Sequence, residues 1–140
     1  NGKYQELKIP DMQDEKVSRG VAFGDLDNDG DVDIVINNNQ GEAQIWRNES
    51  NRNNWIGIKL IDPDGPEIGS KVHLLPNLCR TQRISSDGSF ASASDHRVIF
   101  GLGKDDDWRK ILVQWADGKR EVFGPLAINQ YHLLSRQETR

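Results

Sequence analysis

Residues 24–35 read GDLDNDGDVDIV and place five aspartates within nine positions. Apolar, β-branched residues flank this stretch, so the chain concentrates negative charge between two segments of strand-like composition. Carboxylates this close repel one another, and solvent would only screen the repulsion, whereas a bound cation would relieve it. The stretch therefore favours a cation-binding loop formed by Asp25, Asp27, Asp29, Asp31 and Asp33.

The spacing of these residues is typical of a calcium loop. Asp25, Asp27 and Asp29 occupy positions 1, 3 and 5, and Gly30 at position 6 permits a sharp turn. Calcium accepts six to eight oxygen ligands at roughly 2.3–2.6 Å, so alternate residues of a curled loop can each donate one. We therefore expect Ca²⁺ as the cofactor.

The second half of the loop separates it from an EF-hand. Asp31 at position 7 is expected to offer its backbone carbonyl with its side chain in solvent, and Asp33 at position 9 its carboxylate. An EF-hand needs a bidentate glutamate at position 12, where this chain has Ile36. A solvated acidic turn and a magnesium or manganese site remain as alternatives, although magnesium usually retains several waters in its shell.

The rest of the sequence predicts an all-β protein. Short runs rich in β-branched and aromatic residues alternate with Gly, Asn, Asp and Pro clusters, and no window combines a helical period with caps. An Asp-Gly turn at residues 117–118 predicts that strands 110–116 and 120–123 form a hairpin. The predicted strands are 4–9, 21–26, 32–37, 43–47, 55–61, 71–75, 80–85, 97–102, 110–115, 120–123 and 131–135.

Composition excludes some classes of partner, and a polar segment predicts a domain boundary. The formal net charge of −4 and pI of about 5.3 argue against nucleic acid as a partner, and no apolar run approaches the ~20 residues that membrane insertion requires. The lone Cys79 cannot form an internal disulfide, and we expect it to be buried or half-buried. The segment NESNRNN at 48–54 predicts a boundary between a unit at 1–50 and one at 55–137.

Several motifs carry a family resemblance. SRGVAFGDLDNDGDVDIV at 18–35 resembles an FG-GAP/VCBS repeat, and IGSKV at 68–72, FGLG at 100–103 and VQWADGK at 113–119 are similar to the ASPIC/UnbV domain of the cartilage acidic protein-like family. The resemblance covers about residues 18–135. It implies a single blade of an integrin-α-like propeller with a calcium loop, packed beside a small β-sandwich or barrel-like domain.

One segment departs from the family pattern. Relatives commonly carry Ser-Gln-Ser-Asp-Pro-Arg before the Phe-Gly-Leu-Gly run, and here Ser92, Ser94, Asp95 and Arg97 keep their places while His96 replaces the proline. A propeller needs several blades, so one repeat implies the C-terminal part of a longer protein, with the rest of its own propeller as a partner.

These features predict a non-catalytic calcium-binding module with an adhesive or structural role. We expect an extracellular, periplasmic or cell-surface location, an unidentified extracellular protein or glycan as partner, and no catalytic residues, since no Gly-x-Ser-x-Gly elbow accompanies the serines near Asp95. The alternative is a carbohydrate-binding accessory domain of a secreted enzyme, with tryptophans and segment 92–97 as the contact surface. Trp46, Trp55, Trp108 and Trp115 are more readily explained as core residues.

Overall fold

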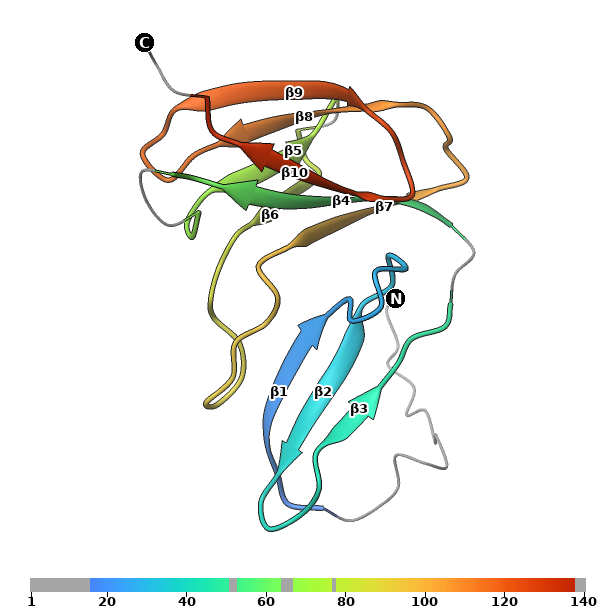
Figure 1. Ribbon diagram of the computed structural model, residues 1–140, viewed down its shortest axis with the longest axis vertical. Helices are drawn as coiled ribbons and strands as arrows, with labels where there is room; N and C mark the ends of the chain where they lie inside the picture. Colours follow the sequence, from blue (N-terminus) through green and yellow to red (C-terminus); the bar gives the residue numbers. More distant parts are fainter. Residues whose placement is uncertain (1–15, 51–52, 64–66, 77, 138–140) are drawn as a thin grey trace, which may run out of the picture.

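The computed structural model describes residues 16–50, 53–63, 67–76 and 78–137, which form ten strands and no helix (Figure 1). The prediction of an all-β protein is therefore confirmed over this part of the chain. The strands are β1 (Ser18–Gly24), β2 (Asp33–Asn38), β3 (Gln44–Trp46), β4 (Asn54–Ile61), β5 (Lys71–Leu74), β6 (Thr81–Arg83), β7 (Val98–Gly103), β8 (Arg109–Gln114), β9 (Arg120–Leu126) and β10 (Tyr131–Ser135).

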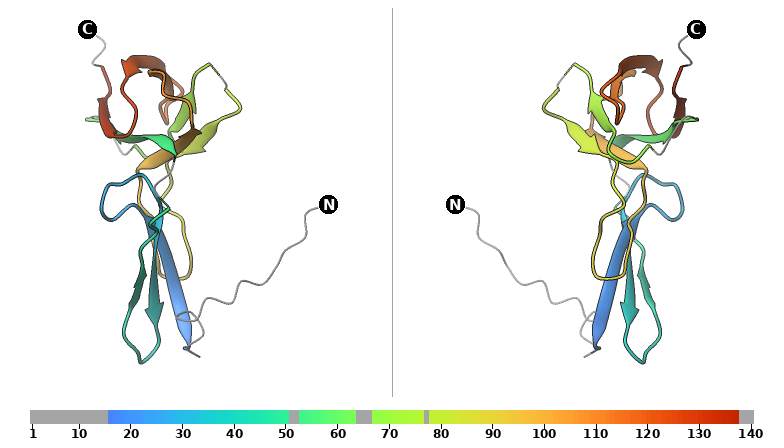
Figure 2. Two further views of the ribbon diagram at one scale, coloured as in Figure 1. Left: turned by 90° about the vertical axis from the view of Figure 1, so that its right-hand side faces the viewer. Right: turned by 90° about the vertical axis from the view of Figure 1, so that its left-hand side faces the viewer.

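The first three strands form an antiparallel sheet of order β1-β2-β3, which we call the N-terminal sheet. The turn that joins β1 to β2 is the aspartate loop, residues 25–33, which starts where Gly24 pairs with Asp33. The N-terminal sheet extends away from the remaining strands as the lower part of an elongated molecule (Figures 1 and 2).

The remaining strands form two open sheets, of order β10-β4-β7 and β6-β5-β8-β9, which we call the C-terminal unit. Buried side chains from both sheets belong to one hydrophobic cluster, so the two sheets share a core in the manner of a sandwich. Neither sheet closes into a barrel. The core residues are Ile56, Ile58, Leu60, Val72, Leu74, Ile84, Val98, Phe100, Leu102, Ile111, Val113, Trp115 and Leu134.

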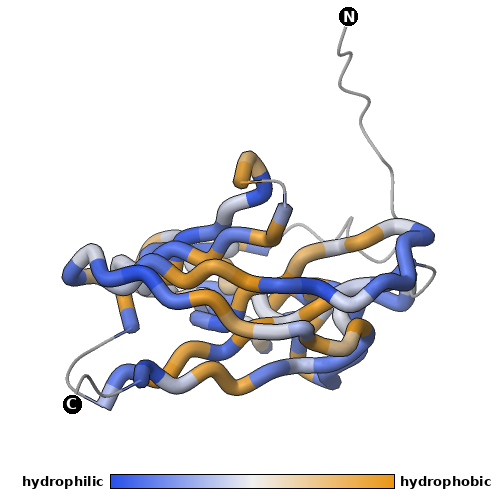
Figure 3. The backbone as a smooth tube through the Cα atoms, turned by 90° about the horizontal axis from the view of Figure 1, so that it is seen from above, coloured by the Kyte–Doolittle hydropathy of each residue, from blue (hydrophilic) through white to orange (hydrophobic). Residues whose placement is uncertain are grey.

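Alternation along β4 explains how the C-terminal unit receives the aspartate loop. Ile56 and Ile58 lie in the core, and Trp55 and Lys59, which alternate with them along the strand, lie on the opposite face of the sheet. On that opposite face Trp55 is buried although it does not belong to the core cluster. Hydrophobic segments, in orange, and hydrophilic segments, in blue, follow one another along the backbone (Figure 3). A second surface, outside the core, is therefore available for packing.

The N-terminal sheet has no comparable core within the described residues. In 16–50 the buried positions are Gly20, Asp25, Asp33 and Asn38, and none is a large apolar side chain. Phe23 and Ile45 are 46% and 67% exposed. Polar contacts and contacts with the C-terminal unit must therefore stabilise this sheet.

Most predicted strands lie within two or three residues of observed ones, and the hairpin is confirmed, with Gln114 opposite Arg120 and Gly118 at φ +91°. The strand predicted at 4–9 lies outside the described residues. The parallel pairing of β10 with β4 was not predicted.

Two burial predictions in the C-terminal unit were wrong. Cys79 is exposed, because it lies in the turn between β5 and β6. Trp55 and Trp115 are buried as expected, but Trp108 is 64% exposed because it precedes β8 in the loop that follows β7.

Candidate metal centre

Three aspartates converge at the start of the aspartate loop. A carboxylate oxygen from each of Asp25, Asp27 and Asp29 lies within 4.8 Å of those from the other two. The backbone curls to allow this, with φ of +63° at Asn28 and +92° at Gly30. Short polar asparagine and glycine are the residues that tolerate this left-handed region best. The turn chemistry in the sequence therefore produces the convergence directly.

Asp25 is the buried anchor of the loop, with 1% of its surface exposed. Its Oδ1 accepts a hydrogen bond from the Asp29 amide at 3.1 Å, and its Oδ2 accepts one from the Gly30 amide at 2.8 Å. A carboxylate offers about four acceptor positions, so Oδ1 keeps one for a cation. These bonds hold the loop curled around the carboxylate.

Asp29 and Asp31 continue the same pattern. The Asp29 Oδ1 accepts the Asp31 amide at 2.9 Å. The Asp31 carboxylate, expected to face solvent, is half-buried and accepts a hydrogen bond from the Ser50 hydroxyl at 3.0 Å. Its side chain therefore connects the loop to the segment after β3.

The carboxylate of Asp33 does not lie in the group that Asp25, Asp27 and Asp29 form in the described part of the chain. It is 1% exposed, and its two oxygens accept the backbone amides of Leu26 and Asn48, both at 2.8 Å. Asp33 thus ties the two ends of the loop together and fixes the exit of β3. Its role as a ligand stays a prediction.

A positively charged side chain, Arg47, lies beside the three aspartates. The Arg47 Nε lies 2.6 Å from Asp27 Oδ2 and 3.0 Å from Glu49 Oε1, with the arginine side chain 57% exposed. Burial raises the pKa of the Asp27 carboxyl, Arg47 opposes this, and the other carboxylates of the loop add to the rise. Arg47 therefore lowers the pKa of Asp27 by less than desolvation and the neighbouring carboxylates together raise it.

The C-terminal unit contributes two residues to the loop. The Tyr131 hydroxyl donates to Asp25 Oδ2 at 2.7 Å. Arg97 donates from one terminal nitrogen to the Asp25 carbonyl and from the other to Asn28 Oδ1, each at 2.5 Å. Burial and then the bond to Asp25 raise the pKa of Tyr131 well above its ordinary value, so its hydroxyl stays a donor.

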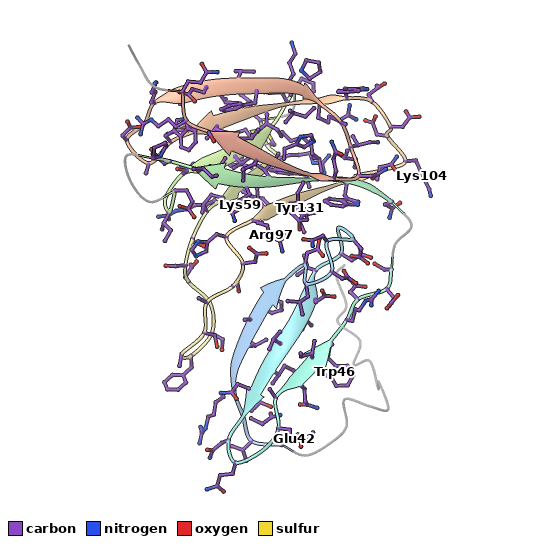
Figure 4. All side chains as sticks on the ribbon, viewed as in Figure 1. Glu42, Trp46, Lys59, Arg97, Lys104 and Tyr131 are labelled. Carbon is purple, nitrogen blue, oxygen red and sulfur yellow. The ribbon has the colours of Figure 1, made fainter. Side chains whose placement is uncertain are left out.

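Aromatic packing completes this contact. The Arg97 guanidinium lies 4.4 Å from the centroid of the Tyr131 ring, and Trp55 meets Tyr131 edge to face at 5.1 Å. A Cβ added at Gly30 would overlap the Trp55 indole, so the loop backbone lies directly on that ring. Figure 4 shows Tyr131, Arg97 and Lys59 together, on the side of the sheet that faces the loop.

The segment between β6 and β7 runs beside β1 and adds further contacts. The Asp95 amide donates to the Phe23 carbonyl at 2.9 Å, and the Phe23 amide donates to Ser94 Oγ at 3.3 Å. Asp95 also accepts Arg97 Nε at 2.6 Å. Residues 92–97, the motif in which His96 replaces proline, are therefore a docking segment between the two parts of the molecule.

Sequence reasoning found the three converging aspartates but missed the residues that hold them from outside. Arg97 could have been found from the sequence, since it belongs to the segment 92–97 that resembles the family pattern. No sequence pattern indicated Tyr131, because it is 106 residues from Asp25 and is simply the first residue of a predicted strand. The pairing that brings it to the loop is the parallel register of β10 on β4, in which Tyr131 lies opposite Gly57.

Several hollows lie on or beside the C-terminal unit, and two of them bear on the predicted functions. One of about 540 Å³ adjoins the aspartate loop and is lined by Asn28, Lys59, Arg97 and residues 129–133. The other, of about 490 Å³, is lined by Leu75, Pro76, Leu78, Trp108, Arg109 and Lys110.

Trp115 is 1% exposed and cannot contact a glycan, which removes it from the predicted carbohydrate-binding surface.

Comparison with known families assigns the second half of the chain. A family model described as ASPIC and UnbV matches residues 63–140, more than half of the 140 residues. No curated protein matches the sequence. Within the described residues, no helix has the length and apolar composition that crossing a membrane requires.

Proposed function

The chain belongs to the ASPIC and UnbV family, and from this membership and the aspartate loop we propose that it is a non-catalytic calcium-binding module. In this proposal residues 18–50 are an FG-GAP/VCBS repeat, one blade of a larger propeller. The observation that carries the proposal is the convergence of Asp25, Asp27 and Asp29 to within 4.8 Å. Three carboxylates and no nitrogen or sulfur donor form a hard donor set that suits calcium.

The loop fits calcium better than magnesium. Magnesium demands near-ideal octahedral geometry and usually keeps several waters, whereas calcium tolerates an irregular shell of protein oxygens. The loop offers carboxylates from alternate residues, and in this proposal the Asp31 carbonyl joins them in such a shell. When bound, calcium would supply the positive charge that Arg47 alone does not.

The role of this site is structural. Asp25 and Asp33 are buried, and they accept the amides of Gly30 at the turn and of Leu26 at the start of the loop, so the same residues that would bind the cation also hold the connection between β1 and β2. Cation binding to the folded loop would stabilise that geometry by mass action. We propose an extracellular, periplasmic or cell-surface location with an adhesive or structural role, and we assign the site the affinity of roughly 0.1–1 mM that is typical of extracellular calcium modules.

The N-terminal sheet supports the view that this is one blade of several. Its strands carry exposed apolar side chains such as Phe23 and Ile45 and no large buried ones in the described residues. A sheet of this kind needs a partner surface, and we propose that neighbouring blades of the same protein provide it.

Thermal melting with and without calcium tests the proposal. At 10 mM calcium, a site of the affinity given above adds about 1.4–2.7 kcal/mol, a rise in Tm of several degrees for a chain of this size. Asp27→Ala should abolish the rise. Asp106→Ala, an exposed carboxylate outside the loop, is the matched control and should retain it. An unchanged Tm in the parent chain, or an equal rise in Asp27→Ala, would show that the loop binds no calcium.

The alternative function, carbohydrate binding, has one supporting observation. Trp108 is 64% exposed beside the hollow that it lines with Leu78 and Arg109, which gives an aromatic ring next to a hydrogen-bond donor. A glycan array decides the matter. Selective binding that Trp108→Ala removes without changing the Tm would favour the accessory-domain function.

A further inference from the structure

We propose that Tyr131 and Arg97 are positioning residues that couple the aspartate loop to the C-terminal unit, so that cation binding at the loop strengthens the docking of the two parts. This inference rests on the proposed calcium function. It concerns residues more than 65 positions away in the sequence from the loop atoms that they contact.

Tyr131 acts on the orientation of the buried ligand. Its hydroxyl and the Gly30 amide together occupy the acceptor positions of Asp25 Oδ2, at 2.7 and 2.8 Å. With Oδ2 held from two sides, the carboxylate cannot rotate freely, and Oδ1 is the oxygen left with an open position. The C-terminal unit therefore sets which oxygen of Asp25 a cation meets.

Arg97 acts on the backbone of the same turn. It binds the Asp25 carbonyl and the side chain of Asn28, the residue whose φ of +63° curls the loop. Its own position is fixed by Asp95, through Nε and through the backbone amide, at 2.6 and 2.9 Å. Because Asp95 in turn bonds to Phe23 in β1, the docking segment holds the loop at its entry and at its turn.

Packing makes the contact specific to one arrangement. Tyr131 lies between the Trp55 ring and the Arg97 guanidinium, and Gly57 leaves the space that the tyrosine ring fills. The loop cannot shift on this surface without disturbing Trp55, since Gly30 lies directly on that indole. The loop and the outer face of the β10-β4-β7 sheet thus have one mutual geometry.

Thermodynamic linkage gives the consequence. If docking orders the loop for the cation, then the cation must favour docking by the same factor. A hydrogen bond to a charged acceptor corresponds to about tenfold or more in an equilibrium constant. The Tyr131 bond also exists without the cation, so only part of it should be lost as calcium affinity, and we expect binding about fivefold to tenfold weaker. Tyr131→Phe retains the ring that packs on Trp55 and Arg97, so the change isolates that bond.

Calorimetric calcium titration of the whole chain tests the coupling. We expect Tyr131→Phe and Arg97→Lys to weaken calcium binding about fivefold or more. Ile111→Val, which alters a fully buried core position away from the loop, is the control and should leave calcium affinity unchanged even though it lowers the Tm. Equal affinities in the parent chain and Tyr131→Phe, or an equal loss of affinity in Ile111→Val, would overturn the coupling.

A double-mutant cycle in chelator separates this inference from the calcium proposal. Asp25→Ala, which leaves no side-chain acceptor, Tyr131→Phe and the double variant are unfolded with urea in EGTA. Their effects on the unfolding equilibrium constant should depart from additivity by about fivefold or more, because the two side chains bond directly. Additive effects overturn the docking contact itself. Non-additive effects with no calcium binding by the parent chain would retain the contact but overturn the proposed function, and with it the link to a cation.

Discussion

Replacement of Gly30 by alanine tests how firmly the aspartate loop lies on the C-terminal unit. At φ +92° an L-residue pays a conformational cost of about 1–2 kcal/mol. The added methyl group would also overlap the Trp55 indole, which is only 9% exposed and cannot move into free space. Forcing a packed ring aside costs about 1–3 kcal/mol more. We therefore expect the free energy of unfolding to fall by about 2–5 kcal/mol.

Gly118 provides a matched control for the backbone cost. Its φ is +91°, and an added Cβ would have no heavy atom within 4 Å. Gly118→Ala should therefore lose only the conformational part, about 1–2 kcal/mol. The difference between the two variants, about 1–3 kcal/mol, measures the contact of the loop with Trp55. For a chain of this size it corresponds to a difference in Tm of roughly 3–15 °C.

Urea unfolding in EGTA, followed by far-ultraviolet circular dichroism and by tryptophan fluorescence, is the assay. Chelator removes any contribution of a cation, so the comparison concerns the polypeptide alone. If Gly30→Ala and Gly118→Ala lose the same stability within about 0.5 kcal/mol, the loop does not pack on Trp55 and the described interface is wrong.

Three further outcomes follow from other contacts. Ile111→Ala, at a fully buried core position, should lower the free energy of unfolding by about 2–5 kcal/mol in urea titrations. Hydrogen bonds from the Lys119 amide and then from Arg136 lower the pKa of Asp117. This carboxylate therefore stabilises the fold above about pH 4, and the stabilisation is lost as the pH falls through the lowered pKa. The Tm difference between the parent chain and Asp117→Asn should shrink on acidification. Arg47→Gln removes the cation beside the loop and should tighten calcium binding severalfold at low salt in calorimetric titrations.

The elements that depend on local chemistry were predictable from the sequence. The Asp117-Gly118 turn specified its hairpin because few residues adopt the required φ, and the β8–β9 register followed. The convergence of Asp25, Asp27 and Asp29 followed in the same way from alternate spacing and a glycine at the turn. In each case the determining residues are close together in the sequence.

The elements that depend on long-range packing were not predictable. Composition could not distinguish Trp108, which is exposed, from Trp115, which is buried, because both adjoin strands. The spacing predicted Asp33 as a ligand but did not show that its two oxygens accept the backbone amides of Leu26 and Asn48. Tyr131 reaches the loop through the pairing of β10 with β4, and no local pattern encodes that pairing.

The parallel pairing of β10 with β4 also sets an order of events during synthesis. The aspartate loop leaves the ribosome about a hundred residues before Tyr131, so its docking surface is incomplete during that interval. Contacts that join such distant residues form slowly because closing a long loop costs chain entropy. Until β10 arrives, one edge of β4 and the outer face beside it stay open to other chains. The nascent protein is thus open to misassembly at this edge until its last described strand takes its place.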